Sequence, residues 1–175
     1  MQGLYPGGRP EYPWAFVLGQ NAVYLGQFLL GALLIEPLSP AASLVYLGFL
    51  VLMLGVVLRK HLCSHCYYYG RRCGTGWGLL AARLFPRGNG NYALGVRLAG
   101  ITWGVAYLLP LLAAGGLWLV PGGRVSLPVL FGFLLFSLLG FFWHRASCAS
   151  CKMRCRCPAS MVRCSLPDRF GRPPF

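Results

Sequence analysis

Cysteine is the residue type in this chain whose spacing points most clearly to chemistry. Two Cys-x2-Cys pairs each come directly after a basic stretch at the end of an apolar run, and a third cysteine follows each pair. Two thiolates three residues apart in a tight turn can reach one metal ion, and two such pairs fit the tetrahedral zinc pattern. The two triplets therefore predict a cysteine-ligated metal site. Its candidate ligands are Cys63, Cys66 and Cys73 in the first triplet and Cys148, Cys151 and Cys157 in the second.

The spacing leaves the number of sites open. One ion shared by the two Cys-x2-Cys pairs would link the two halves of the chain. Two separate ions would each need a fourth ligand, which His61 or His65 would supply to the first triplet and Cys155 or Cys164 to the second.

The identity of the metal also stays open. Zinc is the commonest occupant of sites with four cysteines, or three cysteines and a histidine, and would make the site structural. An iron–sulfur cluster also takes four cysteines, although the Cys-x2-Cys-x6-Cys spacing differs from the standard ferredoxin runs. Neighbouring Arg and Lys are expected to lower the thiol pKa values and so favour the ligating thiolates. A third alternative has no metal, with the cysteines present as thiols or disulfides.

The composition excludes a soluble domain. Hydrophobic residues make up 57% of the 175 residues and charged residues only 11%, against roughly a quarter charged in an ordinary globular protein. The net charge of +13 comes from 16 Lys and Arg against three acids, Glu11, Glu36 and Asp168. Because these acids are far apart in the sequence, a paired-carboxylate active site is not expected. The sequence predicts a small, basic, integral membrane protein.

Four apolar stretches are long enough to cross a bilayer as helices, which takes about 20 residues. They contain no Asp, Glu or Lys. Because they are continuously apolar rather than alternating, a transmembrane β-barrel is not expected. The expected fold class is an all-α integral membrane protein with four transmembrane helices. The expected spans are 14–35, 40–58, 92–120 and 126–143.

Short connections pair these helices into two expected hairpins, through residues 36–40 and 121–125. Thirteen of the 16 basic residues lie between the hairpins or after the second one, and cytoplasmic segments carry the excess of Lys and Arg. We therefore expect a multi-pass protein of the cell membrane with both termini in the cytoplasm. All eight cysteines would then lie on the cytoplasmic side, where thiols are kept reduced.

The two halves of the chain resemble each other. Residues 1–91 and 92–175 each contain a hairpin followed by a cysteine-rich cytoplasmic segment, within one membrane domain. This pattern favours a parallel duplication about an axis along the membrane normal. The alternative is two hairpins whose cytoplasmic ends converged.

Small and polar residues recur inside the spans. In the first span, Gly-Gln pairs at 19–20 and 26–27 lie seven residues apart and share one helix face. Helix packing is the favoured interpretation, and a polar cavity for a substrate such as a lipid headgroup or quinone is the alternative. In the third span, the Gly100-x3-Gly104 pair predicts a packing notch.

Aromatic residues lie among arginines in the loop between the expected hairpins, as Tyr67, Tyr68, Tyr69 and Trp77. Such a mixture is able to stack on nucleic-acid bases, but this loop lies against the bilayer. There Tyr and Trp gather at the headgroup level and Arg meets anionic lipid. The lipid bilayer and its anionic headgroups are thus the expected partners, and no nucleic acid is expected.

These features together predict a membrane protein whose cytoplasmic face carries a cysteine-ligated metal site. Structural zinc would organise the loop and the tail into a scaffold or docking surface for a membrane or cytoplasmic protein partner. One alternative is a membrane redox protein that carries an iron–sulfur cluster or a thiol/disulfide pair. Another is a protein that handles or senses a soft metal. No motif identifies a catalytic residue, and the sequence favours a protein that is not an enzyme.

Overall fold

The computed structural model describes residues 4–119, 121, 123–157 and 160–162 of the chain. Within these residues the fold is helical and contains no strand. The helical elements are α1 (Trp14–Ile35), α2 (Pro40–Leu52), the π-helical segment η1 (Met53–Val57), α3 (Leu58–His61), the 3-10 turn η2 (Cys63–His65), α4 (Trp77–Leu84), α5 (Tyr92–Leu119) and α6 (Leu127–Ala149).

Four helical segments in the described part of the chain are long and apolar enough to span a membrane. They are α1, the run Pro40–His65, α5 and α6. The run Pro40–His65 joins α2, η1, α3 and η2, and it starts where the Ser39 hydroxyl accepts a hydrogen bond from the amide of Ala42 (3.2 Å). The predicted all-α fold, with four helices long and apolar enough to span a membrane, is thereby confirmed for the described residues.

Two of these helices extend beyond the spans expected from hydropathy. The second and fourth spans, expected to end at residues 58 and 143, continue as helix or helical turn to residues 65 and 149. The basic and polar residues there are compatible with helix, so the loss of hydropathy marks a change of environment rather than the end of the helix. Consequently, Cys63 and Cys148 lie at helix ends instead of in loops.

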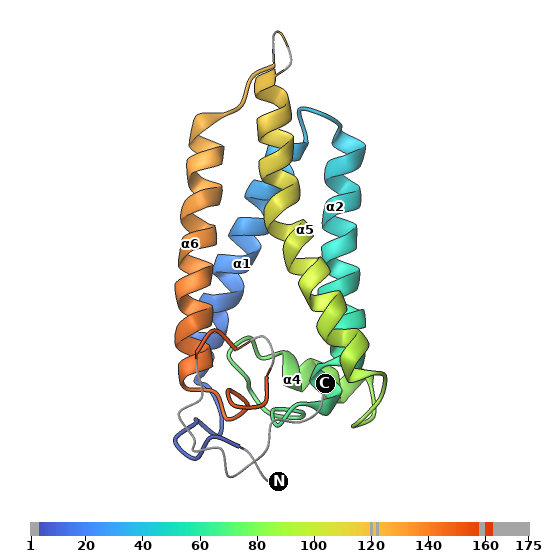
Figure 1. Cartoon of the computed structure of the whole chain (residues 1–175), viewed down its shortest axis with the longest axis vertical. Coiled ribbons are helices and arrows are strands. Elements are labelled where there is room, and N and C mark those ends of the chain that lie inside the picture. Colours follow the sequence, from blue (N-terminus) through green and yellow to red (C-terminus); the bar gives the residue numbers. More distant parts are fainter. Residues whose placement is uncertain (1–3, 120, 122, 158–159, 163–175) are drawn as a thin grey trace.

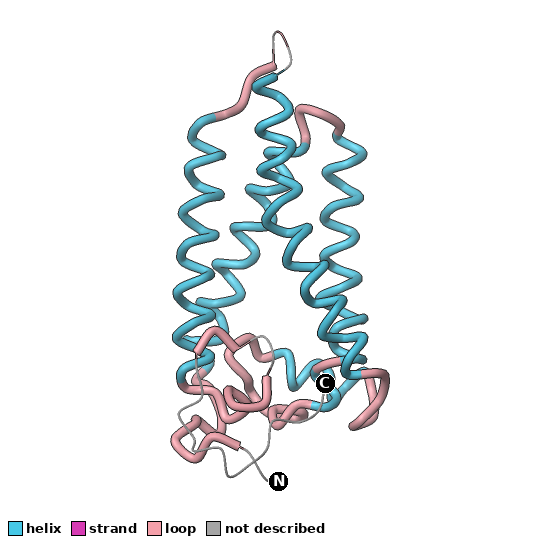
Figure 2. Tube along the Cα trace, viewed as in Figure 1, coloured by secondary structure: helices cyan, strands magenta, loops and turns pink. Residues whose placement is uncertain are grey.

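Helix α1 is the central helix and packs against α2, α5 and α6 (Figure 1). The α1–α2 connection, the C-terminal end of α5 and the N-terminal end of α6 lie together at one end of the molecule. The opposite end holds α4 and most of the loop structure (Figure 2). We call it the cysteine end, because both Cys-x2-Cys pairs lie there.

Helices α5 and α6 come together only at the end away from the cysteines. There Leu34, Ala114 and Phe133 form a buried cluster that joins α1, α5 and α6. Toward the cysteine end, α5 leans toward α2 while α6 continues along α1 (Figure 1). The side chains between the diverging helices line a cavity, which is described below.

Glycines allow α1 and α6 to approach each other closely. A β-carbon on Gly19 would lie 2.6 Å from the Trp143 ring, and one on Gly26 would overlap the ring of Phe136. Any side chain at these positions would therefore push the helices apart. The prediction that the Gly-Gln pairs of the first span serve helix packing is confirmed for their glycines.

The second predicted packing site is wrong. No atom lies within 4 Å of the position that a β-carbon would take at Gly100 or at Gly104. Glycine spacing alone does not decide whether a neighbouring helix approaches, and the face of α5 that carries these two glycines meets no other helix closely. Gly100 instead lines the cavity between α5 and α6.

Candidate functional site

The two Cys-x2-Cys pairs adopt the same local structure. In the first, the amide of Cys66 donates to the carbonyl of Cys63 (3.2 Å), and in the second the amide of Cys151 donates to the carbonyl of Cys148 (3.2 Å). Each pair therefore lies in a tight turn at the C-terminal end of a helical run. The six cysteines of the two predicted triplets are in the thiol form.

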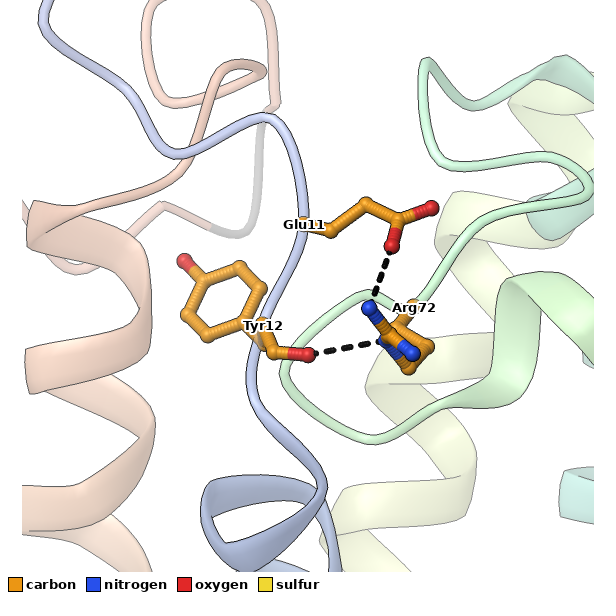
Figure 3. Close-up of polar contacts among 3 residues, drawn as sticks. All are labelled: Glu11, Tyr12 and Arg72. Atoms are coloured by element: carbon orange, nitrogen blue, oxygen red, sulfur yellow. Dashed lines mark hydrogen bonds and ion pairs between the residues drawn. The ribbon is translucent and has the colours of Figure 1, made fainter.

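The N-terminal segment, residues 4–13, connects the two cysteine segments. Tyr12 donates its hydroxyl to the carbonyl of Ser147 in α6 (2.7 Å) and its amide to the carbonyl of Arg72 in the first cysteine loop (3.0 Å). Arg72 returns two contacts, to the Tyr12 carbonyl (3.1 Å) and to the carboxylate of Glu11 (2.7 Å) (Figure 3). This strap has no hydrophobic periodicity, so its position could not be predicted from the residue pattern.

Tyr68 completes this connection from the first cysteine loop. Its side chain is only 1% exposed. Its hydroxyl donates to the carbonyl of Arg9 (2.6 Å) and accepts from the amide of Lys152 (3.1 Å). The expectation that the tyrosine run lies at the membrane surface is therefore wrong for Tyr68. Burial raises the pKa of Tyr68 and that of Tyr12, the latter to about 12, so both hydroxyls stay protonated.

Thiols from both triplets lie against these tyrosines. Cys66 and Cys73 of the first triplet and Cys151 of the second pack on the buried cluster of Tyr12 and Tyr68. We call these five residues the tyrosine–thiol cluster. The two triplets, far apart in the sequence, thus meet at one place in the cysteine end.

Burial, not the neighbouring basic residues, controls these thiols. It raises the pKa of Cys66, and the nearby thiols of Cys63, Cys73 and Cys151 raise it further. Burial likewise raises the pKa of Cys151 to about 11. The expectation that Arg and Lys lower the thiol pKa is therefore wrong for both residues, because the apolar surroundings penalise the thiolate more than distant cations stabilise it.

The described residues do not support a metal site. Among them, no group of three or more His, Cys, Asp or Glu side chains is arranged to hold a metal ion. His61, a suggested fourth ligand, accepts a hydrogen bond from the amide of Asn91 at Nδ1 (2.9 Å). Cys155, suggested for the second triplet, is disulfide-bonded, and Cys164 lies outside the described residues. Zinc and the iron–sulfur cluster stay predictions.

A cavity of about 420 Å³ lies next to the first cysteine turn. Helices α1, α3, α4, α5 and α6 all contribute to its walls, which are mainly apolar. Besides the polar atoms of its tyrosines and tryptophans, Arg59, Cys63, His144 and Cys157 bring polar side chains to it. Its aromatic lining consists of Tyr24, Trp77, Tyr92, Trp103, Tyr107 and Phe141.

Arg59 is the most unusual residue of this cavity. Its side chain is only 2% exposed, and its guanidinium lies 3.5 Å from the centre of the Trp77 ring. Nη1 donates to the sulfur of Cys63 (3.2 Å), whereas Nε is buried with no hydrogen-bond partner among the described residues. A buried arginine with an unused donor is costly unless a further acceptor reaches it.

The role of Arg59 was not predicted, because this residue was counted only among the basic residues that indicate a cytoplasmic segment. The available signal was its spacing from Cys63. Residues four apart lie on the same face of a helix, so a helical continuation would have brought the guanidinium and the thiol together.

Helices α1 and α6 bring a second polar group to the cavity. The hydroxyl of Tyr24 accepts a hydrogen bond from the Gln20 amide (3.1 Å) and lies 3.3 Å from Nδ1 of His144. The Tyr24 ring packs against the ring of Trp103, with centroids 5.1 Å apart. His144 therefore contacts a tyrosine at the cavity.

Helix α1 also holds one of the cavity's aromatic walls in place. The amide nitrogen of Asn21 donates to the carbonyl of Thr75 (2.9 Å), and its oxygen accepts from the indole of Trp77 (3.2 Å). Asn21 thereby fixes the loop that follows Cys73 and the ring on which Arg59 stacks. A polar residue of the first span thus positions one wall of the cavity.

Comparisons with protein-family models, with curated proteins and with solved structures found no match to this chain. The cysteine turns and the adjoining cavity are therefore the basis on which a function is assigned.

Proposed function

We propose that the protein is a membrane thiol redox protein whose two Cys-x2-Cys turns cycle between dithiol and disulfide. The observation that carries this proposal is that one cysteine of each turn, Cys66 of the first and Cys151 of the second, packs in the tyrosine–thiol cluster. Such convergence brings together the sulfur atoms that thiol–disulfide exchange requires.

The turn geometry suits disulfide formation within each pair. The first and fourth residues of a tight turn have Cα atoms less than about 7 Å apart. A disulfide bridges Cα atoms separated by roughly 4.4–6.8 Å. Each pair is therefore able to close without a large movement of the backbone.

Exchange between the pairs conserves atoms and electrons. The Cys151 thiolate attacks the Cys66 sulfur of an oxidised first pair, and Cys63 leaves as a thiolate. Cys148 then attacks Cys151 and releases Cys66, so the first pair becomes a dithiol and the second a disulfide. The Arg59 guanidinium, 3.2 Å from the Cys63 sulfur, stabilises the leaving thiolate.

An external dithiol of the cytoplasm is the proposed source of electrons for the second pair. This source requires that the cysteine end lies in the cytoplasm. The basic residues concentrate between and after the expected hairpins, which favours a cytoplasmic location for both termini and for the cysteine end. The matching turns at the ends of the two halves further support the two-hairpin, duplicated arrangement.

Redox titration of the thiols tests this function. Full-length protein in lipid nanodiscs is equilibrated with mixtures of reduced and oxidised dithiothreitol, and the remaining thiols are counted by alkylation and mass spectrometry. Four thiols of the two turns are expected to titrate, in addition to the disulfide at Cys155. Cys66→Ser should remove the thiols of the first pair from the titration, whereas Cys73→Ser, a change in the same cluster but outside the turns, should leave all four titrating.

Metal analysis of the anaerobically purified protein provides the opposing result. Turn thiols that never oxidise across the titration, together with about one zinc ion per chain, would contradict the redox proposal. That outcome would return the assignment to a structural zinc module.

A further inference from the structure

We infer that the cavity between α5 and α6 binds the ring of a membrane quinone, which accepts the electrons of the Cys63–Cys66 dithiol. The inference rests on the proposed thiol function, because a quinone is the oxidant that the first pair requires. It names the ligand and the site, which the thiol function alone leaves open.

The walls of the cavity fit a flat, apolar ring. Trp77, Trp103 and Phe141 supply aromatic surface, and Gly100 leaves open space where any other residue would project a side chain. At about 420 Å³ the cavity lies in the usual range for small-molecule sites. Aromatic rings pack favourably on such walls.

The polar atoms of the cavity fit a ring that carries carbonyl oxygens. The Nε of Arg59 is buried and has no hydrogen-bond partner among the described residues, so a ligand oxygen would satisfy it. His144 of α6 also lines the cavity, next to the Tyr24 hydroxyl, whereas Arg59 belongs to α3. A quinone carries two carbonyls on opposite sides of its ring, which suits polar groups on two walls.

The same lining disfavours an anionic lipid headgroup. Among the described residues, Arg59 is the single Lys or Arg that lines the cavity, and aromatic side chains surround it. An ionised phosphate would lose its hydration and gain one cation, whereas a neutral carbonyl loses far less. The chemistry at Arg59 therefore favours a neutral oxygen acceptor.

The position of the cavity suits a lipid-soluble ligand. It lies where α5 and α6 diverge and do not pack closely against each other, within segments long and apolar enough to span a membrane. A ligand dissolved in the bilayer would enter between these helices. Cys63 lines the same cavity, so the reacting thiol and the ligand would share one space.

The redox step balances. Two S–H bonds break at Cys63 and Cys66, and an S–S bond forms between them. The two electrons and two protons pass to the two carbonyl oxygens, which become the hydroxyls of the quinol. The disulfide left behind is the species that Cys151 attacks in the proposed exchange.

The experiment uses a fully substituted 1,4-benzoquinone with a decyl chain, because its ring has no free position for thiol addition. Binding to full-length protein in phosphatidylcholine nanodiscs is followed by quenching of tryptophan fluorescence, and quinol formation is followed by absorbance under anaerobic conditions. The matched variants are Gly100→Leu and Gly104→Leu. Both positions have open space for a side chain, but only Gly100 lines the cavity.

We expect the parent and Gly104→Leu to bind alike, and Gly100→Leu to bind about tenfold more weakly or worse because leucine occupies the ring's space. Equal binding by the two variants, or no binding by the parent, overturns the inference. Unchanged quinol formation in Gly100→Leu also overturns it while leaving the thiol function standing. Binding without quinol formation supports the site and contradicts the thiol function.

A second series of nanodiscs tests whether an anionic lipid headgroup occupies the cavity instead. Phosphatidylglycerol replaces part of the phosphatidylcholine in the nanodiscs. Unchanged quinone binding supports the inference. Binding that falls in proportion to the anionic lipid in the parent, and not in Gly100→Leu, would assign the cavity to a headgroup and overturn the quinone assignment.

Discussion

The two Cys-x2-Cys turns share their spacing and the length of their closing hydrogen bond, 3.2 Å in both, but differ in their surroundings. Cys63 has the buried guanidinium of Arg59 at 3.2 Å and faces an aromatic cavity. Cys151 instead lies under the N-terminal strap, which Tyr12 anchors to α6. Spacing therefore determines the shape of a turn, whereas the residues packed around it determine what its sulfur atoms are able to do.

The largest expected difference between the turns concerns the cysteine next to the cavity. In a single turnover of the fully reduced protein with excess decyl-quinone, the parent should form about two quinols per chain. Cys63→Ser should form none, because it removes the thiol at the cavity, and Cys148→Ser should form about one. The measurement is quinol per chain by absorbance. Equal yields from the two variants would contradict the proposal that the first turn reduces the quinone and the second turn reduces the first.

Arg59 should account for much of the difference in rate between the turns. Arg59→Gln should slow quinol formation by about 10- to 100-fold, since it removes a charge-assisted hydrogen bond to sulfur and a donor in the cavity. Arg59→Lys should restore part of the rate. Arg71→Gln is the control, because Arg71 is exposed and bonds Tyr67 outside the cavity. Stopped-flow absorbance measures the rates, and a loss in Arg71→Gln equal to that in Arg59→Gln would argue against a local role.

The link between the turns should depend on Tyr68. Tyr68→Phe removes the hydroxyl that bonds Arg9 and Lys152, so we expect a loss of about 1–2 kcal/mol in unfolding free energy. Hydrogen exchange of the strap amides should also become faster. Tyr67→Phe, at a less buried position, is the control. If exchange in the strap stays as slow as in the parent, Tyr68 does not hold the two cysteine segments together.

The smallest effect is expected at the ion pair of the strap. Glu11 and Arg72 lie 2.7 Å apart, but their side chains are 40% and 34% exposed. Glu11→Gln should therefore cost no more than about 1 kcal/mol of stability. Glu36→Gln, at the other end of the molecule, is the matched control in thermal unfolding at low and high salt. A larger, salt-sensitive loss in Glu11→Gln would show that the strap depends on charge rather than on Tyr12 and Tyr68.

The length of the apolar runs was sufficient to predict four spanning helices, because a bilayer leaves few alternatives to helix for a continuous apolar segment. Hydropathy could not predict where the helices end. The stretch from His144 to Cys148 is polar yet helical, since polar residues are compatible with helix outside the bilayer as well as inside it.

The site was predicted only in part. Cysteine spacing identified the two turns, but not that Cys66 and Cys151 pack on one cluster, because that cluster depends on the strap at residues 4–13 and on Tyr68. Gly100 was taken for a packing residue, since a sequence does not reveal whether a helix lies opposite a glycine. The cavity arises from the divergence of α5 and α6, a tertiary feature that no local pattern records.

The most direct test of the central claim is to identify the first disulfide that forms. Fully reduced, anaerobic protein is mixed with one equivalent of decyl-quinone, quenched with acid, alkylated and mapped by mass spectrometry as a function of time. The proposed function predicts that a Cys63–Cys66 disulfide appears first and that Cys148–Cys151 follows as the first pair is reduced again. Formation of Cys148–Cys151 before any Cys63–Cys66 disulfide, or no disulfide at either turn, would contradict it.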